Sequence, residues 1–194
     1  MTTIPVKTAT AADQDHIIAV LALAFSTDPG ARWIYPDPYN YMSYFPEIIR
    51  AFGGSAFQHG TAHYVEGFFG AALWLPPDVA PKEQEMMALM QRTVAESTLA
   101  DFRCVMEQAS RYRPTEPHWY LPLTGVDPAH QSSGYGSALM KHALTTFDSE
   151  QKLAFLESTN QRNVPFYQRH GFEVLGTVQV RSSPTSFSML RRPR

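Results

Sequence analysis

The stretch GVDPAHQSSGYGSALM at residues 125–140 decides the fold. It follows an apolar segment typical of a buried strand, has Gly134 and Gly136 in a tight loop, and continues into an amphipathic helix. Backbone N–H groups of residues 131–137 can converge on one anion, and the helix N-terminus adds about half a positive charge. Glycine at both positions avoids a Cβ that would obstruct the turn or the approach of a phosphate. The stretch therefore predicts a pyrophosphate-binding loop that needs no lysine.

The sequence around this stretch alternates between strand and helix patterns. Thr10 and Asp13 form a capping-box pattern before a helix, residues 28–38 contain Pro and Gly and predict a structured loop, and residues 82–112 are helical in pattern. We also expect a helix at residues 39–52, a short helix at 165–169, and strands at 4–8, 63–66, 70–75, 119–126, 152–156, 172–180 and 186–190. This order predicts an α/β fold with a mixed sheet, in one domain that spans residues 1–194.

Composition limits the partners that the protein can have. The chain has 16 Lys and Arg against 18 Asp and Glu, a formal net charge of -2, so no overall basic field would attract nucleic acid or an anionic membrane. No apolar leader segment follows Met1, and no run reaches the ~20 apolar residues of a membrane-spanning helix. Cys104 is the only cysteine and is expected to be a buried, unreactive side chain. We expect a cytoplasmic monomer or homodimer with a small-molecule partner.

Two segments resemble a known family when they are taken together. The pattern Gln131-x-x-Gly134-x-Gly136 after a strand resembles the acetyl-coenzyme A-binding motif of the GNAT acetyltransferase superfamily, whereas a Walker lysine and the third glycine of a dinucleotide fingerprint are missing. The segment FLESTNQRNVPFYQRHGF at residues 155–172 is similar to the family's next strand and acyl-donor helix. RPTEPHWYL at residues 113–121 and the Leu-Glu of the later segment resemble the puromycin N-acetyltransferase branch.

The resemblance implies a GNAT fold, in which a mostly antiparallel sheet contains two parallel strands that splay apart to bind acetyl-CoA. Ser132 and Ser133 depart from the pattern, because many relatives have a Lys or Arg next to a Gly there. No metal is implied, and the spacing of His59 and His63 gives little reason to expect one because Gly60 disfavours a helix. The implied cofactor-binding residues are Thr124, Val126, Gln131, Ser132, Ser133, Gly134, Tyr135, Gly136, Ser137, Asn163 and Phe166.

The implied reaction needs an acid and a base. An amine with a pKa near 10 is neutral in only about one molecule in a thousand at pH 7, so a group must take its proton. Glu157, at a strand end that faces the splay, is the candidate general base, although such a carboxylate can equally serve a salt bridge. The resemblance implies that Tyr167 is the general acid that protonates the leaving thiolate; a buried structural tyrosine is the alternative.

The acceptor side is less well defined by the sequence. Phe25, Trp33 and Tyr35 are candidate substrate-binding residues, because an aromatic set can line a pocket for an amine or can simply belong to the core. We expect an acetyl-CoA-dependent N-acetyltransferase that acts on a small-molecule amine by direct attack in a ternary complex. Acetylation of a protein or peptide, and a non-catalytic acyl-CoA-binding domain, are the alternatives.

Overall fold

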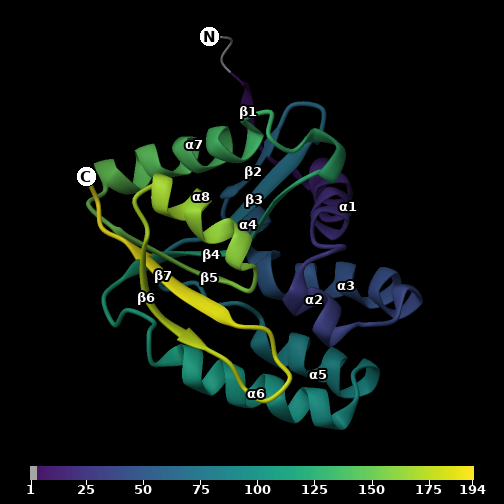
Figure 1. The fold of residues 1–194 in the computed structure, drawn as a ribbon. Helices are drawn as coiled ribbons and strands as arrows, with labels where there is room; N and C mark the ends of the chain where they lie inside the picture. The colour runs from purple at the N-terminus through teal and green to yellow at the C-terminus, as the bar shows by residue number, and fades with distance from the viewer. Residues whose placement is uncertain (1–3) are drawn as a thin grey trace.

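Seven strands form one mixed sheet in the computed structural model, which describes residues 4–194 (Figure 1). The spatial order is β1-β2-β3-β4-β5-β7-β6, and every neighbouring pair is antiparallel except β4 and β5, which are parallel. The strands are β1 (Val6–Thr8), β2 (Ala62–Val65), β3 (Gly70–Leu75), β4 (His118–Val126), β5 (Leu153–Ser158), β6 (Glu173–Val178) and β7 (Ser186–Arg191). The predicted α/β fold, with a mostly antiparallel sheet and one parallel pair, is confirmed.

Helices cover both faces of the sheet (Figure 1). One face packs against α1 (Gln14–Ala24), α2 (Pro29–Ile34), α3 (Pro38–Gly53), α4 (Ser55–Gln58), α5 (Glu83–Thr93) and α6 (Glu96–Ser110). The other face packs against α7 (Tyr135–Ser149) and α8 (Val164–Arg169). None of these helices, within residues 4–194, is both long enough and apolar enough to cross a membrane.

The alternation of side chains along β4 and β5 divides the core into two clusters. Tyr120 and Phe155 face the α1 side, whereas Leu121 and Leu156 face the α7 side. All four are at most 4% exposed, which is why these strands read as continuous apolar runs. Residues two positions apart on either strand therefore point to the same face of the sheet.

Three local predictions can be compared with the observed elements. The capping box is confirmed, because the Thr10 N–H and hydroxyl both donate to Asp13 Oδ2, at 2.8 and 2.7 Å. Residues 28–38 are more regular than predicted: Pro29 starts α2, since proline suits the first helical position. Residues 82–112 are helical as predicted and form two helices, because Val94 adopts an extended conformation between α5 and α6. Cys104 was expected to be buried and is exposed.

The last strand of the chain lies inside the sheet. β7 pairs with β5 along one edge and with β6 along the other. Its final residue, Arg191, is 4% exposed and donates to both carboxylate oxygens of Asp148, each at 2.7 Å, and its Nε donates to the His170 carbonyl. This contact joins β7 to the end of α7.

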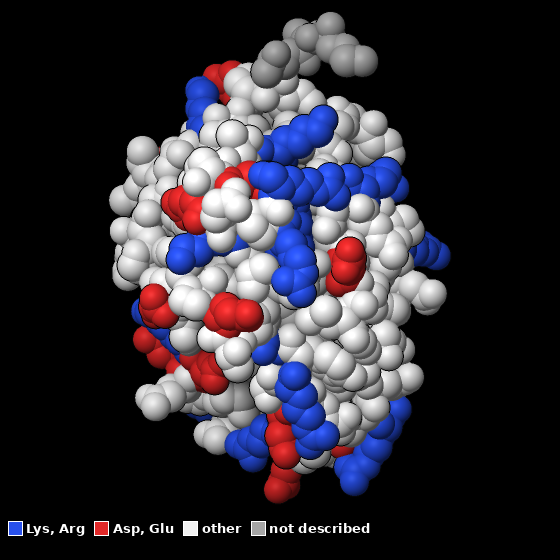
Figure 2. Space-filling model, turned by 90° about the vertical axis from the view of Figure 1, so that its left-hand side faces the viewer, with Lys and Arg blue, Asp and Glu red and all other residues white. Residues whose placement is uncertain are grey.

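Charges of both signs are interspersed on the surface. Figure 2 shows the side of the molecule that lies on the left in Figure 1, where blue Lys and Arg side chains and red Asp and Glu side chains alternate from top to bottom. This mixed surface agrees with the formal net charge of -2.

Candidate active site

The two parallel strands separate partway along their length. Paired residues run from His118 and Leu153 to Leu121 and Leu156, where the ladder ends. Pro122 follows directly, and a proline has no N–H to donate to a neighbouring strand. Beyond Leu156, β5 continues to pair with β7, while β4 continues to pair with β3. Beyond Leu121, the edge of β4 that faces β5 is therefore unpaired. The end of β4 lines a cavity of about 580 Å³.

The loop between β4 and α7 contributes many of the residues that line this cavity. Asp127 accepts hydrogen bonds from the Ala129 N–H at 2.9 Å and from His130 Nδ1 at 3.0 Å, which fixes the start of the loop. Gly134 has φ +84°, in the left-handed region that favours glycine. A Cβ on Gly136 would come within 3.3 Å of the Phe166 ring, which lines the cavity. The loop therefore has the turn and the open backbone that a bound pyrophosphate requires.

Most of the cofactor-binding residues proposed from sequence come together at this cavity. Ser133 is the exception, since it does not line the cavity. Asn163 stands at the N-cap position of α8, but its side chain makes no capping hydrogen bond and it lines the cavity instead. The residues that do line it are Thr124, Val126, Gln131, Ser132, Gly134, Tyr135, Gly136, Ser137, Asn163 and Phe166.

Tyr167, on α8, also lines the cavity. It is 7% exposed and packs against Phe166 and Phe172 in the cluster on the α7 side of the sheet. Burial raises the pKa of the Tyr167 phenol well above its usual value near 10, and the nearby charge of Asp28 raises it further. The phenol is therefore protonated at neutral pH and can donate a proton into the cavity.

Glu157 lies on the opposite face of β5 from Leu156, the residue before it. It points to the α1 side, like Phe155, and it does not line the large cavity. The Tyr120 hydroxyl donates to Glu157 Oε2 at 3.0 Å. Burial raises the pKa of the Glu157 carboxyl, while Arg113 and the Tyr120 hydrogen bond oppose this rise. Tyr167 and Glu157 thus approach the splay from opposite faces of the sheet.

A second carboxylate, Asp28, lines the cavity beside Tyr167 and was not singled out from sequence. It is 8% exposed, and its Oδ1 accepts from the Gly30 and Ala31 N–H groups at 2.9 and 3.0 Å and from Thr159 Oγ1 at 2.9 Å. Burial raises the pKa of the Asp28 carboxyl. The contact ties the segment before α2 to the segment after β5, and a Cβ on Gly30 would lie only 2.7 Å from Thr159. Asp28 caps α2, which was predicted to be a loop, and nothing in the neighbouring sequence indicates that its carboxylate is buried.

The three aromatic residues proposed for the acceptor are placed differently from one another. Phe25 lines the large cavity. Trp33 Nε1 donates to Ser182 Oγ at 3.2 Å, so it joins α2 to the segment between β6 and β7. Tyr35 is 1% exposed and its hydroxyl is 2.8 Å from Thr93 Oγ1, which gives it a position in the core.

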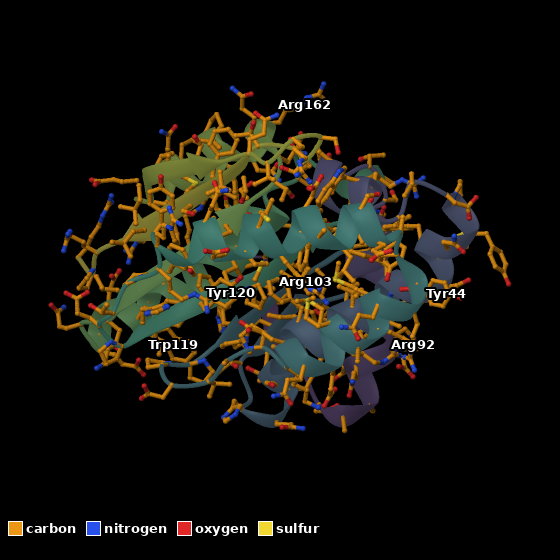
Figure 3. All side chains as sticks on the ribbon, turned by 90° about the horizontal axis from the view of Figure 1, so that it is seen from below. Tyr44, Arg92, Arg103, Trp119, Tyr120 and Arg162 are labelled. Carbon is orange, nitrogen blue, oxygen red and sulfur yellow. The ribbon has the colours of Figure 1, made fainter. Side chains whose placement is uncertain are left out.

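Two arginines that the sequence analysis did not single out also line the cavity. Arg162 precedes α8 and Arg169 ends it, and both are exposed. Figure 3 shows Arg162 at the edge of the molecule, with its side chain directed away from the body of the domain. They are the only Lys or Arg among the residues that line the cavity.

His63, one of the two histidines whose spacing was considered for a metal, packs against another histidine. His63 is next to His142 of α7, with ring centroids 4.7 Å apart. Burial lowers the pKa of His63 to about 4, so the ring is neutral at pH 7. Among residues 4–194, no three His, Cys, Asp or Glu side chains are close enough to hold a metal ion together.

Comparison with known proteins agrees with this geometry. The model of the acetyltransferase (GNAT) family matches residues 79–172. A structure described as histone acetyltransferase HPA2 and related acetyltransferase from Corynebacterium glutamicum is 25% identical, with a TM-score of 0.70 over 100% of this chain and 98% of the other. An agmatine N-acetyltransferase is 17% identical, with a TM-score of 0.67 over 98% and 100% of the two chains. A Drosophila melanogaster polyamine N-acetyltransferase is 18% identical, with a TM-score of 0.66 over 97% and 99%.

Proposed function

Because the chain is an acetyltransferase of the GNAT family, we propose that it moves an acetyl group from acetyl-CoA to the primary amine of a small molecule by direct attack in a ternary complex. The observation that carries this proposal is the cavity at the splay of β4 and β5, which both the glycine-containing loop and Tyr167 line. The agmatine and polyamine enzymes share the fold and act on small amines, as their names state, which supports the same class of acceptor here.

The proposed reaction divides its steps among residues on the two faces of the sheet. Bound acetyl-CoA supplies the thioester. The backbone of residues 131–137 would hold the pyrophosphate of acetyl-CoA, and the free edge of β4 would hold its pantetheine arm. Glu157, on the α1 side, takes a proton from the ammonium group of the acceptor, directly or through water. Tyr167, on the α7 side, donates its proton to the departing thiolate. The amine nitrogen gains the acetyl group as the carbon–sulfur bond breaks. The second proton that the nitrogen loses on becoming an amide restores the Tyr167 phenol, and the proton held by Glu157 passes to solvent, so one proton is released in each turnover.

We place the acceptor near the segment between β6 and β7, and the contacts that this segment makes favour a small acceptor. Trp33 and Ser182 join α2 to the segment between β6 and β7, and Arg181 donates to the buried Asp101 of α6 at 2.6 Å. These contacts hold the segment at both sides. A protein substrate would need an open groove between these elements, so they would have to separate before a lysine side chain could enter.

Screening of an amine library tests this function. Thermal shift in the presence of acetyl-CoA should identify amines that stabilise the protein further, and a thiol-release assay should show turnover with them. The library should include agmatine, polyamines, arylalkylamines and lysine-containing peptides. Turnover with peptides alone would overturn the small-molecule acceptor. Stabilisation by acetyl-CoA without turnover on any amine would instead indicate a binding domain.

Acetyl-CoA affinity should depend on Arg162 and Arg169. Residues 114–140 contain no Lys or Arg, so the phosphates have no cation from the loop, whereas these two guanidinium groups line the same cavity. Replacing both with Gln should raise the Kd of acetyl-CoA about tenfold at low salt, as expected for one or two exposed phosphate contacts. The difference should shrink as salt rises. Calorimetric titration at two salt concentrations measures both effects.

Arg111→Gln provides the matched control, because Arg111 is also exposed and does not line the cavity. Its Kd should stay at the wild-type value. An unchanged Kd in the double variant at low salt would contradict the role given to Arg162 and Arg169.

A further inference from the structure

Three residues from separate parts of the sequence meet on the α1 side of the sheet. Arg113 follows α6, Tyr120 lies on β4, and Glu157 lies on β5. The Tyr120 hydroxyl donates to Glu157 Oε2 at 3.0 Å, and Arg113 Cζ lies 4.6 Å from the centroid of the Tyr120 ring. Figure 3 shows Tyr120 within the body of the domain, and the residue is 4% exposed. The reaction as described above uses only Glu157 of the three.

We propose that Tyr120 and Arg113 are positioning residues for Glu157. The Tyr120 hydroxyl holds one carboxylate oxygen, Oε2, so that the other oxygen is directed to the acceptor amine. Arg113 packs its guanidinium group over the Tyr120 ring, and its positive charge favours the ionised form of the Glu157 carboxyl. This inference rests on the proposed function, in which Glu157 is the general base.

Two aromatic rings pack against Tyr120 and orient its hydroxyl toward Glu157. Tyr120 is paired with Phe155 across the parallel strands, and the two rings are 6.0 Å apart with an angle of 26° between their planes. Phe52 of α3 meets the ring edge-on, with centroids also 6.0 Å apart. Glu157 is two residues beyond Phe155 on the same face, so the hydroxyl reaches past Phe155 to the carboxylate. A donor fixed in this way orients a base without a conformational cost at the moment of reaction.

The charges around Glu157 explain why such support is needed. Burial raises the pKa of its carboxyl, and Glu83 of α5 adds a like charge that raises it further. Arg113 and the Tyr120 hydrogen bond lower it again. Burial raises the pKa of Tyr120 far above its usual value, and an arginine is always charged, so both supports persist across the working pH range. The net effect is a pKa above the usual value of a glutamate, which makes the Glu157 carboxylate a stronger base.

Direct titration of Glu157 tests this inference without any knowledge of the acceptor. In protein labelled with ¹³C at the glutamate carboxyls, the Glu157 signal is assigned by its loss in Glu157→Gln. We expect Tyr120→Phe and Arg113→Gln each to raise the titration midpoint of Glu157 by about one pH unit, since each removes an interaction with the ionised form. Arg113→Lys retains the charge and should restore most of the wild-type midpoint.

Tyr112→Phe is the control, because Tyr112 packs against Gly176 nearby and its hydroxyl does not contact Glu157. Its midpoint should match the wild type. Acetyl-CoA affinity measured by calorimetry should be unchanged in all four variants, which shows that the cavity is intact. Should Tyr120→Phe fail to fold, Arg113→Gln carries the test alone. A Glu157 midpoint that does not move in the folded variants would overturn the inference.

The pH dependence of turnover separates this inference from the proposed function. With a probe amine from the library, such as agmatine, the acidic limb of the kcat profile should move upward in Tyr120→Phe by as much as the Glu157 midpoint moves. If the midpoint moves while the limb stays in place, Glu157 is held by Tyr120 but is not the base. If Glu157→Gln abolishes the limb while Tyr120→Phe leaves both unchanged, Glu157 is the base and the positioning role is wrong.

Discussion

Replacing Tyr167 with Phe should lower kcat about 100-fold at neutral pH and leave acetyl-CoA affinity within about threefold of the wild type, as expected when a general acid is removed. The ring stays, so the packing against Phe166 and Phe172 is preserved, and only the proton donor is lost. The wild-type phenol remains protonated throughout the working range, because burial raises its pKa. Steady-state thiol release and calorimetric titration of acetyl-CoA measure the two quantities.

Tyr64→Phe is the matched control for this substitution. Tyr64 is similarly buried, at 9% exposure, and stacks on Phe68 outside the cavity. Its kcat should equal that of the wild type. If the Tyr167→Phe enzyme turned over at the wild-type rate from pH 6 to pH 9, the acid would have to be another group or the solvent.

Replacing Glu157 with Gln should lower kcat to a similar extent, about 100-fold at pH 7, because the amide cannot take a proton from the ammonium group of the acceptor. The base acts when it is ionised, so the wild-type rate should rise with pH through the pKa of Glu157, which burial raises above its usual value of 4.5. The variant should lack this limb. Its defect should become smaller as the pH approaches 10, where the amine itself loses its proton.

Glu150→Gln is the control for this variant. Glu150 Oε2 accepts a hydrogen bond from Trp119 Nε1 at 2.9 Å, so it also supports an aromatic side chain of β4, but it does not line the cavity. Its kcat should remain within about twofold of the wild type. A Glu157→Gln enzyme with an intact acidic limb would shift attention to Asp28, the carboxylate that shares the cavity wall with Tyr167.

Much of the fold could be predicted because its signals are local. The loop at residues 125–140 carries its own glycines, the strands carry apolar runs, and the capping box at Thr10 and Asp13 is read from two side chains. The position of the break between α5 and α6 could not be read from the sequence, because helical charge and methionine patterns continue on both sides of Val94. Helix α2 was missed because Pro29 and Gly30 suggest a turn when their neighbours in space are not known.

The site residues that lie close together in the sequence could be predicted, whereas those brought together from distant segments could not. Most of the proposed cofactor-binding residues lie in two short stretches, and the structure brings them to one cavity. The Asp28 carboxylate accepts a hydrogen bond from Thr159, which is 131 positions away in the sequence. The residues around Asp28 give no indication of this contact. The placement of Tyr35 beside Thr93, and of Trp33 beside Ser182, depends in the same way on long-range packing. An aromatic loop alone does not show which rings face a ligand and which face the core.

The interior position of β7 has a consequence for the synthesis of the protein. β5 and β6 are made before β7, yet β6 joins the sheet only through β7. While the chain emerges from the ribosome, one edge of β5 therefore remains without its partner until β7 (Ser186–Arg191) is available, and contacts of this kind form slowly. Loss of residues 183–194 would remove β7, release β6 and expose the edge of β5 beside Glu157. A nascent chain that stops early would thus lack activity and be prone to aggregation, although nearly all of its active-site residues are present.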